Sequence, residues 1–151
     1  MREALRLAKE ELKRAEHSIY VSLKYTRTVE VIKGIIHRLI NAIDHAVLAL
    51  LKHAEEQGKI DKVPSLPRQR LEALQQTFAE DKLLQNYVAF YTLLRKIDKA
   101  SFASVSEYRK GVAMIAEFDG QKVEITIDII TDYFTKTSEL VNLILQRIEE
   151  A

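Results

Sequence analysis

The sequence contains no cysteine and no tryptophan, and it has only two prolines and four glycines in 151 residues. The absence of cysteine excludes disulfides, zinc–thiolate sites, iron–sulfur clusters and a thiol nucleophile. No glycine-rich phosphate loop, HExxH metal motif or GxSxG nucleophile motif occurs. We therefore expect neither a cofactor nor a bound metal ion.

Long apolar runs and an excess of one charge are also missing. No stretch reaches the 18 uninterrupted apolar residues typical of a membrane-spanning helix, and residues 1–16 are too charged for a secretory signal. Lys and Arg number 23 against 22 Asp and Glu, so the chain lacks the overall basic excess of many nucleic-acid binders. We expect a cytoplasmic protein that does not associate with membranes.

Hydrophobic residues make up 47% of the chain, enough for one domain spanning 1–151 to bury its own core. Gly58, Pro64 and Pro67 crowd into one connection between helices rather than a domain boundary. Apolar residues at helical spacing predict five helices, at residues 2–24, 29–57, 67–78, 81–97 and 129–149. Three residues are predicted to cap the helices that follow them: Thr28, Ser65 and Asp128.

The second predicted helix, 29–57, should be the central one. Its apolar residues cover an arc of roughly 200° at about 100° per residue. A helix that buries only one side has a narrower apolar stripe. The first helix instead carries a narrow seam with Leu5 and Leu12 seven residues apart and Ala8 and Ala15 between the larger residues, a pattern that permits a close neighbour.

The pattern changes near the C-terminal third, where Asp119-Gly120 separates two apolar runs. Val123, Ile125 and Ile127 alternate with polar residues, and Asp-Gly between such runs is a strong hairpin signal. A β-hairpin at about 108–127 is therefore predicted. The expected fold is mainly α: an up-down helical bundle of four to five helices with one β-hairpin before the last helix.

The candidate functional residues lie in the stretch HRLINAIDH, from His37 to His45. Arg38, Asn41, Asp44 and His45 fall within about 120° of one another around the helix, on the side opposite the apolar arc. A central helix needs one polar side, so this stripe is typical of a solvated face. The alternative is a catalytic cluster, because Arg38 and His45 lie only about 20° apart around the helix and about 10 Å apart along it.

The Arg38-x6-His45 spacing resembles the signature of HEPN domains, which are helical bundles. The opening LRLAKEELKRAEHSIYVSLKY followed by a second long helix is similar in style, so the resemblance covers about the first third of the chain. It implies a dimeric, metal-independent ribonuclease in which His45 promotes attack of a 2′-hydroxyl, Arg38 steadies the phosphate and Asn41 and Asp44 support them. Many members of the family are non-catalytic partners or ligand-binding modules.

Glu107 and Arg109 are a second candidate site, because they are expected to alternate onto one strand face at a hairpin edge that could dock a partner. The leading interpretation is a small non-catalytic interaction or scaffold module that self-associates as a homodimer. The alternatives are the HEPN-like endoribonuclease acting on RNA and a bundle with a cavity for a small apolar ligand between the second, fourth and last helices.

Overall fold

The computed structural model describes residues 1–150 and is mainly helical, with a three-stranded antiparallel sheet before the last helix. The elements follow in the order α1 (Arg2–His17), a π-helical segment (Ser18–Ser22), α2 (Leu23–Tyr25), α3 (Val29–Glu56), α4 (Pro67–Thr77), α5 (Lys82–Lys99), β1 (Ser101–Val105), β2 (Ala113–Phe118), β3 (Gln121–Thr126) and α6 (Ile127–Glu149). The mainly α fold class and the hairpin before the last helix are confirmed.

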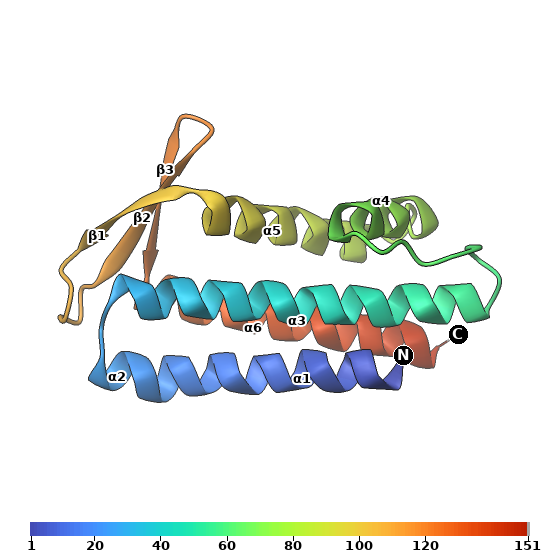
Figure 1. Cartoon of the computed structure of the whole chain (residues 1–151), viewed down its shortest axis with the longest axis horizontal. Coiled ribbons are helices and arrows are strands. Elements are labelled where there is room, and N and C mark those ends of the chain that lie inside the picture. Colours follow the sequence, from blue (N-terminus) through green and yellow to red (C-terminus); the bar gives the residue numbers. More distant parts are fainter. Residues whose placement is uncertain (151) are drawn as a thin grey trace.

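The long helices run side by side, with α1 on one side of α3 and with α4 and α5 on the other (Figure 1). The helix α6 lies along α1 and α3 and contacts both. The sheet stands at one end of the molecule, and both chain termini lie at the opposite end. The sheet end is therefore free of chain ends.

The helix α3 is the centre of the core, as its wide apolar arc predicted. It packs against α1, α4, α5 and α6. Ile32, Ile35, Ile36 and Leu39 are completely buried along it. Because full burial of an aliphatic side chain contributes about 1.5–3 kcal/mol, α3 is a principal source of stability.

By length and composition α3 is also the one helix among residues 1–150 that could cross a membrane, with a mean hydropathy of 1.4 over its most apolar window. In this structure 61% of that window is buried inside the protein. The core helix of a soluble protein has the same character, and the burial of α3 is consistent with one.

The helix α1 meets its neighbours through alanines. Ala8 and Ala15 are completely buried and Ala4 nearly so, whereas Leu5 and Leu12 are only partly buried. Small side chains let two helix backbones approach closely, so the predicted seam exists but its deepest members are the small residues. The predicted helix 2–24 is interrupted near its end by the π-helical turn.

One of the three predicted helix caps is confirmed and two are wrong. Thr28 caps α3 as predicted, because its Oγ1 accepts a hydrogen bond from the Val31 N–H at 3.4 Å. The caps predicted at Ser65 and Asp128 are wrong. The residue before α4 is Leu66, which has no side-chain acceptor, and α6 is capped by Thr126, whose Oγ1 accepts from the Ile129 N–H at 3.2 Å.

The sheet has the strand order β1-β2-β3. Asp119 and Gly120 form the turn between β2 and β3 with φ of 51° and 72°, the left-handed pair that a two-residue hairpin favours. The hairpin is therefore confirmed, with two differences. The strand β1, which pairs antiparallel with β2, was not predicted, and Ile127 begins α6 instead of ending the strand.

The predicted strand face at Glu107 and Arg109 is wrong. Both residues lie in the turn between β1 and β2, because Ser106 and Tyr108 adopt φ of 54° and 66° and end the extended backbone. The Tyr108 N–H donates to the Arg27 carbonyl at 2.6 Å, which holds this turn against the connection between α2 and α3.

Candidate functional site

The polar stripe of α3 is divided between two neighbouring helices. At one end, Arg38 turns towards α1, where its Nη1 lies 3.4 Å from both carboxylate oxygens of Glu11. The Glu11 side chain is only 12% exposed and the Arg38 side chain 41%. Arg38 thus links α3 to α1 and keeps part of its guanidinium in solvent.

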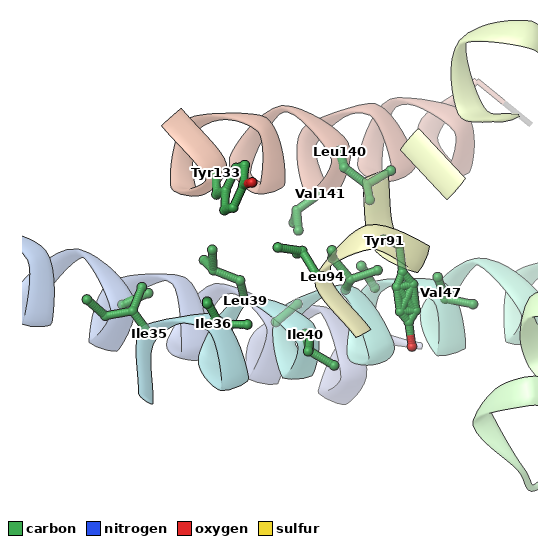
Figure 2. Packing of buried hydrophobic residues seen from close by; sticks show 14 of the residues in the cluster. Ile35, Ile36, Leu39, Ile40, Val47, Tyr91, Leu94, Tyr133, Leu140 and Val141 are labelled. Carbon is green, nitrogen blue, oxygen red and sulfur yellow. The ribbon is translucent and has the colours of Figure 1, made fainter. Parts of the chain in front are cut away.

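At the other end, Asp44 faces α5. The Tyr91 hydroxyl donates to Oδ1 of Asp44, and Nη1 of Arg95 donates to the Tyr91 hydroxyl oxygen at 3.0 Å. Tyr91 is only 3% exposed, and its ring stands beside Val47 of α3 (Figure 2). These two hydrogen bonds are partly buried, and together they join α3 to α5.

Burial governs the titration of this network. It raises the pKa of Asp44, against the opposing effects of the Tyr91 hydroxyl and of the nearby Arg95, His45 and Arg70 side chains. Burial and the adjacent Asp44 also raise the pKa of Tyr91 well above its usual range. At neutral pH Tyr91 is therefore a hydrogen-bond donor and cannot act as a base.

Asn41 and His45 are half-buried, and within residues 1–150 neither makes a side-chain hydrogen bond. His37 is exposed and its Nδ1 lies 3.9 Å from an oxygen of Asp98 on α5. The four predicted site residues thus share a stripe of α3 but form no single constellation, since Arg38 contacts α1 and Asp44 contacts α5.

Arg38 does line an open groove of about 370 Å³ between α1 and the first half of α3. Its other walls come from α1 and the start of the π-helical segment, and they include Lys13, Arg14 and His17. The histidine that shares a groove with Arg38 is therefore His17 and not His45. The sequence analysis did not single out His17, because a spacing within one helix does not report residues across a helix pair.

The cavities elsewhere are either very small or open. A ligand cavity was expected between α3, α5 and α6, and the space lined there by these helices and α4 measures about 10 Å³, enough for about one water molecule. A larger open cavity of about 520 Å³ lies where the π-helical segment meets the start of α6. Lys24, Arg27 and Lys110 line it together with Asp128, so its charge is mixed.

No group of three or more His, Asp or Glu residues suited to a metal ion occurs among residues 1–150. Comparisons with protein-family models, curated proteins and solved structures found no match to this chain. The resemblance to HEPN domains therefore stays a prediction.

The Asp44 network gives a pH-dependent prediction for the Asp44→Asn variant. Because the folded chain binds the Asp44 proton more tightly than the unfolded chain, this carboxyl favours folding most below its ordinary pKa of 3.8. The contribution is lost as pH rises through the raised pKa. Asn can still accept from Tyr91 but does not titrate, so the stability of Asp44→Asn relative to wild type should increase from pH 3 to pH 7.

Urea unfolding at several pH values measures this difference. Asp61→Asn is the matched control, since Asp61 is exposed on the connection after α3. A stability difference for Asp44→Asn that stays constant with pH, or falls as pH rises, would contradict the raised pKa of Asp44.

Proposed function

We propose that this chain is a small up-down helical-bundle module that binds protein partners, its own copies among them, and catalyses no reaction. One observation carries the proposal, namely where the apolar side chains are exposed. Eight large hydrophobic side chains are exposed in residues 1–150. Six of the eight are Tyr20, Val21, Tyr25, Phe102, Val105 and Tyr108.

These six residues come from two segments that meet at the sheet end of the molecule, where the Tyr108 N–H donates to the Arg27 carbonyl. Single exposed apolar residues are ordinary on a protein surface, but a concentration of them in one region is typical of an interaction site. The sheet end is also the end of the molecule opposite both termini (Figure 1).

Self-association is the testable part of the proposal. Light scattering over a micromolar dilution series should give a mass approaching twice the chain mass of 17.4 kDa at the higher concentrations. A closed two-fold dimer is the commonest assembly for soluble homo-oligomers. A mass that stays at 17.4 kDa across the series would contradict self-association.

A HEPN-like, metal-independent endoribonuclease is the second candidate, and the half-exposed guanidinium of Arg38 in an open groove is the observation that favours it. The ion pair with Glu11 speaks against it, since a phosphate would have to compete with that carboxylate. Wild-type protein incubated with single-stranded RNA in EDTA should show no cleavage above a mock preparation. Cleavage that is lost in His45→Ala or His17→Ala would support the nuclease and overturn the non-catalytic proposal.

A further inference from the structure

The outer edge of β1 is unpaired and exposed. All five of its residues are exposed, the strand order places β1 at one edge of the sheet, and no backbone hydrogen bond from elsewhere in residues 1–150 reaches it. Natural proteins protect such edges with charged residues, prolines or bulges. The sequence of β1, Ser-Phe-Ala-Ser-Val, has none of these protections. The opposite edge strand, β3, carries Lys122 and Glu124 exposed.

The hairpin register shows which main-chain groups β1 offers. The two-residue turn makes Phe118 and Gln121 a hydrogen-bonded pair, and hydrogen-bonded and non-hydrogen-bonded pairs then alternate along β2. Ala113, Ile115 and Glu117 of β2 therefore direct their N–H and C=O groups towards β1.

Their partners in β1 are Ser101, Ala103 and Val105, whose main-chain groups are used within the sheet. The N–H and C=O groups of Phe102 and Ser104 consequently point away from the sheet. This edge thus presents two residues, each with one free donor and one free acceptor.

We propose that β1 pairs antiparallel with β1 of a second copy of this chain, centred on Ala103, to form a continuous six-stranded sheet across a two-fold axis. The inference rests on the proposed self-association and names its surface. In this register Phe102 exchanges two hydrogen bonds with the partner's Ser104, and Ser104 does so with the partner's Phe102. All four residues that point outwards at the two edges are then satisfied.

Neighbouring registers satisfy fewer groups. A shift by two residues places Ala100 or Ser106 opposite one of the outward residues. The Ala100 N–H already donates to the Ile97 carbonyl, and the Ser106 carbonyl already accepts from the Arg109 N–H. A shift by one residue would place a residue with outward-facing N–H and C=O groups opposite a residue whose groups face β2.

Charge complementarity selects a second copy as the occupant. Lys99 precedes β1 and Glu107 follows it, at equal distances in sequence from Ala103. Because the two copies run antiparallel, the end of each β1 that follows Lys99 lies beside the end of the partner's β1 that precedes Glu107. Neither side chain forms an ion pair within residues 1–150. An antiparallel copy of the same segment supplies a charge of the opposite sign at both ends of the strand.

An apolar contact accompanies the backbone pairing. Phe102 is 38% exposed, and the Lys33 ammonium lies 4.8 Å from its ring centroid. In the paired sheet Phe102 and the partner's Phe102 lie on the same face as diagonal neighbours, about 7–8 Å apart, within reach of aromatic side chains. Both copies would therefore bury an aromatic ring that is partly in solvent in the single chain.

A disulfide between two copies tests the register, and the absence of native cysteine makes the test clean. Ala103 would face the partner's Ala103 as a non-hydrogen-bonded pair with Cα atoms about 4.5 Å apart, within the range for a disulfide. Ala103→Cys should become largely a covalent dimer under mild oxidation. Ser101→Cys is the control, because it is exposed on the same face but lies about 14 Å from the partner's position 101.

The proposal is overturned if Ala103→Cys forms no more covalent dimer than Ser101→Cys, since collisions in solution would cross-link both variants equally. Replacing the charges gives a second measurement. Lys99→Glu should weaken self-association, and adding Glu107→Lys in the same chain should restore it, because the pair is then reversed at both ends.

The Ser104→Pro variant separates this inference from the proposed function. Proline removes the outward N–H of Ser104, which β2 does not use, and proline is tolerated on edge strands. Its helical circular dichroism should be unchanged while its dimer dissociation constant rises about tenfold or more. Ser104→Thr keeps the N–H and should stay dimeric.

The outcomes are distinct. A wild-type chain that is monomeric at all concentrations overturns the proposed self-association itself. A wild-type dimer that persists in Ser104→Pro overturns the β1 pairing alone and leaves self-association through another surface.

Discussion

Replacing Leu39 with alanine is expected to lower the free energy of unfolding by about 2–5 kcal/mol. Leu39 is completely buried, and Figure 2 shows its side chain between α3 and α6, near Leu94 of α5. Removing three carbon atoms there forfeits their burial and leaves a cavity. The cavity cannot easily close, because α3 is held at once by four other helices. Urea unfolding followed by circular dichroism, at one fixed protein concentration, measures the change.

Leu83→Ala is the matched control for this loss. Leu83 is 50% exposed on α5, so the same truncation should change the free energy of unfolding by only about 0.5 kcal/mol or less. Similar losses in the two variants would contradict the position of α3 at the centre of the core.

The central position of α3 could be predicted because a helix that is buried on several sides has a recognisable pattern of apolar residues. An apolar arc of roughly 200° has no stable place on a protein surface, so the helix that carries it must contact several neighbours. The β2–β3 hairpin was predictable for a similar reason, since Asp119 and Gly120 adopt a left-handed backbone that few other residue pairs accept.

The strand β1 has no such pattern in the sequence. It is exposed on both faces, so its residues follow no alternation of apolar and polar side chains, and its small residues have little preference for a strand. The wrong caps at Ser65 and Asp128 have a local cause. Several residues near each helix start have a side-chain oxygen, and the backbone geometry alone decides that Thr126 is the one that accepts the hydrogen bond.

The candidate site shows the limit of a helical wheel. The wheel correctly groups Arg38, Asp44 and His45 on one side of α3, but it carries no information about which helix lies opposite each residue. The structure places Glu11 of α1 against Arg38 and Tyr91 of α5 against Asp44, so the two ends of the stripe hold different helices together.

The predicted docking edge is a related case. Sequence reasoning chose Glu107 and Arg109 as strand residues, whereas they lie in a turn and the free edge is the preceding strand. Glu107 lies two residues beyond the end of β1, next to the proposed pairing. The sequence indicated that a strand edge lies in this region. It did not indicate that the left-handed backbone at Ser106 ends the strand before Glu107.

Enlarging Ala8 to leucine is expected to lower the free energy of unfolding by about 1–3 kcal/mol. Ala8 is completely buried on α1, the helix that packs on α3 through small side chains. Three added carbon atoms must push the two helices apart or force strained side-chain conformations. Helix propensity cannot explain such a loss, since alanine and leucine differ by only a few tenths of a kcal/mol.

Ala89→Leu, at an exposed position of α5, makes the same change without a neighbouring helix and should be nearly neutral. If urea unfolding finds Ala8→Leu as stable as Ala89→Leu, the close approach of α1 to α3 is refuted.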